Sequence, residues 1–174
     1  MNDHQPVSME VHHEIQQFLY KEARFLDDEM MREWLTDMVD PEIRYQLVVR
    51  DERFRKDKSP DREREVYLFD DDFTILDLRV KQFETGLQYM NDPAQRMIRV
   101  VSNVEAFHRD SDGEFEVHSY GIASRFRRQY EGERSVFRRK DVLRRADDGT
   151  LKLLSRRIEL GERVVRNKNL LFFL

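Results

Sequence analysis

The chain has 174 residues, of which 39% are hydrophobic and 38% are charged, with a net charge of −4 and no cysteine. Its 12 Phe, 6 Tyr and one Trp supply enough apolar bulk for one domain with a packed core, which excludes a disordered chain. The lack of cysteine excludes disulfides, thiolate zinc sites and Cys-ligated iron–sulfur clusters, and without a long apolar run or a signal region we expect a cytoplasmic protein with no membrane span.

We expect residues 1–7 to form a flexible arm and residues 8–174 to form a single domain, because no linker divides them. Ser8 is a suitable N-cap, and apolar residues recur at helical spacing over residues 8–26, which predicts an amphipathic helix. A second short helix should follow and end before Pro41, since proline disfavours helix in the residue that precedes it.

The middle of the chain combines a strand, a loop and a helix. Residues 42–52 alternate well enough to predict a strand. The charged segment 53–65 indicates an exposed loop, and residues 66–69 form a short apolar piece. Asp72 then provides an acidic cap for a third helix, which should end near Gly86.

The second half of the chain shows the period of two that is typical of strands. We predict strands over residues 96–108, 115–130, 134–146 and 151–160, separated by turns that contain glycine. One face of the first should hold Ile98, Val100, Val104 and Ala106, and Gly121 in the second indicates a bulge or bend. Helices followed by strands are typical of α+β proteins. We therefore expect a strongly curved antiparallel sheet wrapped around the N-terminal helices as a half-open cone.

The sequence contains no nucleophile elbow, phosphate-binding glycine loop or dinucleotide fingerprint. Among the histidines, His108 and His118 flank a turn and could lie opposite each other across two strands. With Asp110 or Glu116 they would supply two imidazoles and a carboxylate, a ligand set that binds iron. The simpler interpretation is a pair of solvated imidazoles beside a turn. We therefore predict no metal site in this chain.

A cone-shaped fold could also enclose an acid/base pocket, because burial shifts the pKa of a carboxyl or imidazole group into a range useful for proton transfer. The polar residues that could point inward are Tyr45, Asp77, His118, Tyr120 and Asp141. The simpler interpretation is that they form ordinary ion pairs and hydrogen bonds, as Asp77 could with Lys81 four residues later. A stand-alone cone-fold lyase or isomerase is the alternative function.

Arginine dominates the basic residues of the predicted strands. The first 92 residues hold 13 Lys and Arg against 23 Asp and Glu, whereas the rest hold 18 against 12. Arg is favoured in protein interfaces because its flat guanidinium pairs bidentately and stacks on rings. Arg and aromatic side chains on one sheet could also stack on RNA bases. Since the whole chain is acidic, we prefer protein partners and expect no nucleic acid.

The chain ends in the apolar segment NLLFFL at residues 169–174. Burying one such side chain is worth about 1.5–3 kcal/mol. The tail should therefore end in the core or in an interface, because an exposed tail of this kind favours aggregation.

Three segments occur in a characteristic order. A helix of the form Asp-x-x-x-Leu-x-x-Arg-Val with a following Thr contains Asp72, Leu76, Arg79, Val80 and Thr85. A loop with Tyr89, Asp92 and Pro93 comes next, and then a strand with Arg99, Ser102, Asn103 and Val104. These segments, the N-terminal helix, residues 32–50 and the apolar tail resemble the small (β) subunits of Rieske-type aromatic-ring-hydroxylating dioxygenases from about residue 8 to residue 174. The charged segment 53–65 and Tyr89, a position where the family often has Trp, depart from the pattern and leave the particular enzyme open.

The resemblance implies a cone fold like that of scytalone dehydratase and ketosteroid isomerase. It also implies a structural subunit without catalytic residues, in an enzyme that cis-dihydroxylates aromatic hydrocarbons. The partner would be a large (α) subunit that carries a Rieske [2Fe-2S] cluster and a mononuclear iron, and sister β subunits would complete a hetero-hexamer of three α and three β subunits. The interface residues expected on this basis are Arg99, Arg125, Phe126, Arg128, Tyr130, Phe137, Phe172 and Phe173.

Overall fold

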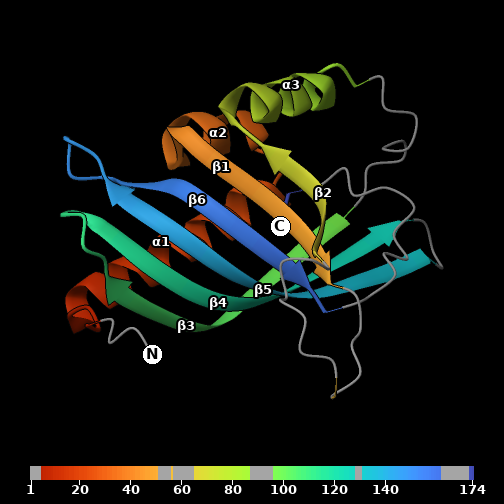
Figure 1. Cartoon of the computed structure of the whole chain (residues 1–174). Helices are drawn as coiled ribbons and strands as arrows, with labels where there is room; N and C mark the ends of the chain where they lie inside the picture. The colour runs from red at the N-terminus through yellow and green to blue at the C-terminus, as the bar shows by residue number, and fades with distance from the viewer. Residues whose placement is uncertain (1–4, 51–55, 57–64, 87–95, 128–130, 162–172) are drawn as a thin grey trace.

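The computed structural model describes residues 5–50, 56, 65–86, 96–127, 131–161 and 173–174. Its elements in chain order are α1 (Met9–Asp27), α2 (Met31–Met38), β1 (Val39–Arg50), β2 (Glu65–Asp71), α3 (Phe73–Glu84), β3 (Arg96–His108), β4 (Glu114–Arg127), β5 (Glu131–Arg145) and β6 (Leu151–Leu160). Figure 1 shows a long, strongly curved sheet with α1 crossing behind its strands. The α+β class predicted from the sequence is confirmed.

The three predicted helices form, and side-chain caps start two of them. The hydroxyl of Ser8 accepts a hydrogen bond from the backbone N–H of Val11 (3.3 Å), and the carboxylate of Asp72 accepts one from the N–H of Ile75 (2.9 Å). Each cap satisfies an N–H group that has no partner within the helix. The buried stripe of α1, which packs this helix chiefly against β3, consists of Ile15, Leu19, Glu22 and Leu26.

The sheet has six strands in the order β2-β1-β6-β5-β4-β3, with β2 and β3 at its two edges in the described part of the chain. Four neighbouring pairs are antiparallel, but β1 and β6 run parallel, with Tyr45 beside Arg156 and Leu47 beside Ile158. The expected antiparallel arrangement is therefore found in four pairs, and the pair of β1 and β6 is the exception. The first strand enters the sheet beside the last one, and alternation along a strand carries no information about the direction of its neighbour.

A β-bulge in β3 reverses which side chains face the core. The register between β3 and β4 shifts after Ser102, and Asn103 has a positive φ of 49°. Asn is among the residues that adopt this left-handed conformation most readily. Ile98 and Val100 are 55% and 53% exposed on the outer face, whereas Ala106 is 4% exposed in the core. The prediction that the apolar residues of this strand share one face is wrong, because alternation does not reveal a bulge.

Gly121 lies in an uninterrupted part of the β4 ladder, opposite Val101 on one side and Phe137 on the other, so there is no bulge at this position. Packing explains the glycine instead. A Cβ atom here would lie 2.4 Å from the Cε2 and Cζ atoms of the buried Phe137 ring. The ring therefore occupies the space that any other residue at position 121 would need.

We expect Gly121→Ala to lower the free energy of unfolding by about 1–3 kcal/mol, the usual range for an overpacked core. Gly132→Ala is the matched control in the same sheet, because the nearest atom to a Cβ at Gly132 is 3.8 Å away. Denaturant unfolding of both variants measures the difference. Equal effects of the two substitutions would show that the contact with Phe137 does not matter.

The segment before α1 is held against the edge of the sheet. The N–H of Val7 donates to the carbonyl of Ala106 (3.2 Å), and the N–H of His108 donates to the carbonyl of Gln5 (2.9 Å). Residues 5–7 of the expected flexible arm are thus hydrogen-bonded to β3, whereas residues 1–4 lie outside the described residues.

The predicted loop 53–65 lies mostly outside the described residues. Of the predicted loop 53–65, the structure describes residue 56 and Glu65, which begins β2. The single domain over residues 8–174 stays a prediction. No helix in the described ranges is long and apolar enough to cross a membrane.

Candidate subunit interface and closed interior

Four charged side chains meet inside the molecule and form a buried charge cluster. Glu22 comes from α1, Arg139 and Asp141 come from β5, and Arg156 comes from β6, and each is at most 5% exposed. Arg156 lies between the two acids, because its Nη2 donates to Glu22 (2.7 Å) and to Asp141 (2.8 Å). Arg139 lies 3.5 Å from Glu22 and 3.8 Å from Asp141. Two positive charges therefore balance two negative charges in the interior.

The sequence places these charges on faces that are otherwise apolar. Arg139 and Asp141 alternate along β5 with the same phase as the buried Phe137 and Leu143, and Glu22 stands in the buried stripe of α1. A charge in the middle of a buried face needs an opposite charge, because an unpaired one is very unfavourable there. The sequence did contain this signal, because Arg139 and Asp141 stand in phase with apolar residues of the same strand. The prediction that the strand arginines lie at the surface did not take it into account.

Electrostatics keeps Glu22 and Arg156 charged near neutral pH. Burial alone would raise the pKa of Glu22, but the charges of Arg156 and Arg139 and hydrogen bonds from Arg156 and Trp34 outweigh it, so the pKa lies below its usual value. Burial alone would lower the pKa of Arg156, but the charges of Asp141 and Glu22 outweigh it and raise that pKa. Groups of this kind do not exchange protons near neutral pH, so they are unsuited to acid/base chemistry.

The folded chain should lose stability in acid as Glu22 takes up a proton. Its pKa is lower in the folded chain than the ordinary 4.5, so its contribution is fully present above about pH 4.5 and is lost as the pH falls through the folded pKa. We expect Glu22→Gln to be less stable than the parent at pH 7 and to depend less on pH in acid. Urea unfolding from about pH 7 to about pH 3.5 measures this, and identical pH dependence of the two chains would contradict it.

The last two residues fill the space beside the buried charge cluster. The ring centroid of Phe173 lies 4.6 Å from that of Trp34 and 6.1 Å from that of Tyr45. The backbone oxygen of Leu174 accepts hydrogen bonds from the Tyr45 hydroxyl (2.9 Å) and from Nη1 of Arg156 (3.1 Å). Phe173 and Leu174 are 3% and 2% exposed, which confirms the predicted burial of the tail for these two residues. The rest of the apolar tail lies outside the described residues.

The residues considered for an acid/base pocket do not come together. Tyr45 and Asp141 point inward, but Tyr45 is hydrogen-bonded to Leu174 and Asp141 to Arg156. The other three lie elsewhere: Asp77 on α3, paired with Lys81 (2.7 Å) as predicted, and His118 and Tyr120 on the outer face of β4. The alternative of an acid/base pocket shared by these five residues does not hold, because the alternation of β4 turns His118 and Tyr120 away from the helices.

His108 and His118 do not lie opposite each other. His108 is paired with Phe115, and His118 is paired with Glu105, on a different rung of the β3–β4 ladder. Among the described residues, no three His, Asp or Glu side chains converge as metal ligands would. Since the chain also has no cysteine, its residues do not fit a Rieske cluster, and those that the structure describes do not fit an iron site of two histidines and a carboxylate.

The outer face of the sheet carries a group of exposed apolar side chains, called the outer patch here. Its centre is a row across three strands, in which Val100, Ile122 and Val136 are direct neighbours. These side chains are 53%, 36% and 45% exposed. The full outer patch consists of Ile98, Val100, Tyr120, Ile122, Phe126 and Val136. A contiguous apolar surface of this kind marks an interaction site.

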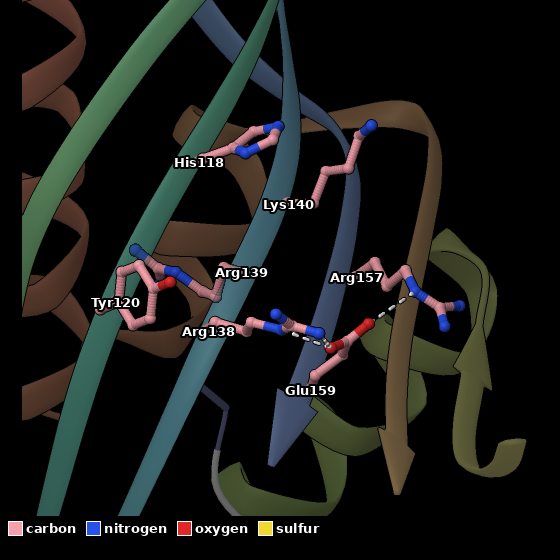
Figure 2. A pocket seen from close by; sticks show the side chains of 7 residues that line it. All are labelled: His118, Tyr120, Arg138, Arg139, Lys140, Arg157 and Glu159. Carbon is pink, nitrogen blue, oxygen red and sulfur yellow. Dashed lines mark hydrogen bonds and ion pairs between the residues drawn. The ribbon is translucent and has the colours of Figure 1, made fainter. Parts of the chain in front are cut away.

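Charged side chains border the outer patch. Arg96, Arg134 and Arg138 are exposed beside it. Toward β6 the border becomes a hollow of about 310 Å³, lined by His118, Tyr120, Arg138, Arg139, Lys140, Arg157 and Glu159. Figure 2 shows Glu159 between Arg138 and Arg157, with ion pairs to both. An apolar centre with an arginine-rich border is the usual composition of a protein interface, so this face is the candidate subunit interface.

The predicted interface residues are divided between the two sides of the sheet. Phe126 is 47% exposed in the outer patch, and the side chain of Arg125 is 10% exposed and paired with Glu133. Three of the predicted residues, namely Arg128, Tyr130 and Phe172, lie outside the described residues. The remaining three have side chains that face inward.

Arg99, Phe137 and Phe173 are used within the chain. The guanidinium of Arg99 pairs with Asp27 and donates to the carbonyl of Phe173 (2.8 Å), and its side chain is 4% exposed. Phe137 packs over Gly121, and both phenylalanines are 3% exposed. Ile98, Val100 and Ile122 were not predicted as interface residues. Apolar residues at both alternating sets of positions in a strand nevertheless indicate that both of its faces are covered.

Comparison with known proteins gives a consistent result. A family model described as ring hydroxylating beta subunit matches residues 21–167. Benzene 1,2-dioxygenase subunit beta of Pseudomonas putida is 31% identical over 173 residues, which cover 97% of this chain and 91% of that protein.

Solved structures agree with the sequence comparison. A chain of naphthalene 1,2-dioxygenase, determined with indole bound in the active site, superposes with a TM-score of 0.90 at 26% identity and covers 97% of this chain and 88% of that one. A scytalone dehydratase-like protein of Novosphingobium aromaticivorans superposes with a TM-score of 0.57 at 12% identity, over 85% and 82% of the two chains. The second likeness concerns the fold alone, and it confirms the predicted cone.

Proposed function

This chain belongs to the ring hydroxylating beta subunit family and is a β subunit of an aromatic-ring-hydroxylating dioxygenase, and we propose that it contributes by assembly rather than by chemistry. The observation that carries the proposal is the closed interior. The ionisable groups of the buried charge cluster bind one another, and Tyr45 and Arg156 also bind the backbone of Leu174. This arrangement argues against the alternative of a stand-alone lyase or isomerase, which needs an acid or base that is available to a substrate.

The proposed partner is a large (α) subunit that carries a Rieske [2Fe-2S] cluster and a mononuclear iron. The donor set of this chain supports that division of labour, because it lacks cysteine and because no metal-ligating group assembles among its described residues. In this arrangement the metals supply the redox chemistry from the partner. The outer patch of this chain, with its arginine border, binds a partner subunit and fixes its orientation.

The substrate of the whole enzyme is proposed to be an aromatic hydrocarbon, which it cis-dihydroxylates. Relatives named for benzene and naphthalene support this substrate class. The proposed assembly is a hetero-hexamer of three α and three β subunits with contacts between sister β subunits, in the cytoplasm and without nucleic acid.

Co-expression with the large-subunit gene tests the proposal. We expect the chain to elute with the large subunit in size-exclusion chromatography and to be retained through an affinity tag on that subunit. A chain that stays monomeric and never co-purifies with an iron-containing partner would overturn the assembly role.

A further inference from the structure

The interior binds the ring of Phe173 on several sides. The Trp34 ring is tilted by 33° with its centroid 4.6 Å away, and the Tyr45 ring meets it edge-on at 6.1 Å. The guanidinium carbon of Arg79 lies 4.6 Å from the ring centroid, and Asp71 holds that arginine through an ion pair of 2.6 Å. Two aromatic rings and an oriented cation are a combination that binds aromatic groups tightly.

The same region binds the backbone that carries this ring. The carbonyl of Phe173 accepts hydrogen bonds from Nε (3.2 Å) and Nη2 (2.8 Å) of Arg99. The Tyr45 hydroxyl donates to the backbone oxygen of Leu174 (2.9 Å) and accepts from the N–H of Leu174 (2.8 Å), and Arg156 donates to the same oxygen (3.1 Å). Three buried side chains therefore converge on the backbone oxygens of two consecutive residues.

Filling a hydrophobic core requires apolar contact only. This region instead combines an apolar space that holds one aromatic ring with a few oriented polar groups, which is the composition of a ligand site. The two arginines are held in place without the tail, because Arg156 is fixed by Glu22 and Asp141 and Arg99 by Asp27. Such a site is organised before its ligand binds.

We propose that the inner face of the sheet is a binding site for an aromatic group with neighbouring amide or carboxylate oxygens, and that Phe173–Leu174 is its resident ligand. Emptying the site makes it available to a small molecule of the same chemistry. This site lies on the opposite face of the sheet from the outer patch. The proposal goes beyond the assembly role and does not depend on it.

Deleting Phe173 and Leu174 gives the first test, with N-acetyl-Phe-Leu as the probe. The ligand is no longer tethered, so millimolar peptide is needed. Trp34 is the one Trp of the chain, so its fluorescence reports on the site directly. At ten times its Kd the peptide should raise the Tm of the truncated chain by about 3–6 °C, and N-acetyl-Ala-Leu should have a much smaller effect.

The folding of the truncated chain does not limit this test. A truncated chain that is unfolded alone and refolds with N-acetyl-Phe-Leu supports the site as well. If neither the Tm nor the Trp34 emission responds to the peptide, or if both peptides act equally, the proposal is overturned.

Phe173→Ala in the full chain gives the second test, because it removes the ring and leaves the backbone in place. We expect toluene to raise the Tm of this variant and to shift its Trp34 emission. Phe126→Ala is the matched control, since Phe126 is 47% exposed on the outer face. Toluene that stabilises both variants equally, or neither, would show that no aromatic site exists at Phe173.

Discussion

Arg156→Met should lower the free energy of unfolding by about 3–5 kcal/mol, the usual effect of breaking a buried ion pair from one side. Arg156 is 0% exposed and donates to both Glu22 and Asp141. The substitution therefore leaves two buried carboxylates with Arg139 as their remaining cation in the cluster. Methionine preserves most of the side-chain volume, so the loss reflects charge rather than a cavity.

Arg44→Met is the control for this prediction. Arg44 lies on β1 of the same sheet, but its side chain is 66% exposed and pairs at 3.0 Å with Asp70, whose side chain is 43% exposed. A surface pair of this kind contributes about 0–1 kcal/mol, so the control should unfold close to the parent. Denaturant unfolding of both variants measures the contrast. Equal losses for Arg156→Met and Arg44→Met would refute a stabilising role of the buried charge cluster.

A double-mutant cycle separates charge balance from packing. Glu22→Gln with Arg156→Met removes one negative and one positive charge and leaves Arg139 and Asp141, which are 3.8 Å apart. The double variant should therefore lose less stability than the sum of the two single losses. Strict additivity would mean that the two side chains do not interact.

Ile122→Glu should weaken co-assembly with the partner subunit. Ile122 is the middle residue of the row that crosses β3, β4 and β5 in the outer patch. Placing a carboxylate at the centre of a desolvated interface should weaken binding by about 2 kcal/mol or more, which is roughly 30-fold. Retention of the chain on an affinity-tagged large subunit measures this loss.

Two controls make the interface prediction specific. Ile122→Val keeps the apolar character of the outer patch and should co-purify like the parent. Ile75→Glu introduces the same charge at an apolar residue of α3 that is 42% exposed, away from the outer patch. The free chains should keep similar Tm values, because surface substitutions usually change stability by less than about 0.5 kcal/mol. Normal assembly of Ile122→Glu would remove the outer patch from the interface.

Local signals in the sequence predicted most of the helices and turns, because caps and tight turns depend on neighbouring residues. Ser8 and Asp72 both cap helices through their side chains. Gly86 follows α3 with a positive φ of 62°, and Gly149 lies in the turn between β5 and β6 with a positive φ of 83°. These conformations are ones that glycine adopts without strain, so their positions can be read from the sequence.

The arrangement of the strands depends on contacts between distant segments, so it was less predictable. The parallel pairing of β1 with β6 joins residues more than a hundred positions apart, such as Tyr45 and Arg156. The bulge at Asn103 is stabilised from outside the strand, because Nε2 of His12 on α1 lies 3.0 Å from the carbonyl oxygen of Val104. Neither the parallel pairing nor the bulge can be predicted from the alternation within one strand.

The candidate site shows the same limit. Alternation separates Arg138 from Arg139 on β5, but it does not state which face of the strand is buried when both faces carry arginine. The apolar composition of the tail predicted that Phe173 is buried. The donors that bind its backbone come from β3, β1 and β6, and only the fold brings Arg99, Tyr45 and Arg156 together.

The most direct test of the assembly role is the distribution of iron and acid-labile sulfide between the separated subunits of the purified complex. We predict that all of the iron and sulfide stays with the large subunit, and that this chain alone carries neither and converts no aromatic substrate. Iron bound stoichiometrically to this chain, or turnover by the isolated chain, would contradict a subunit that acts by assembly.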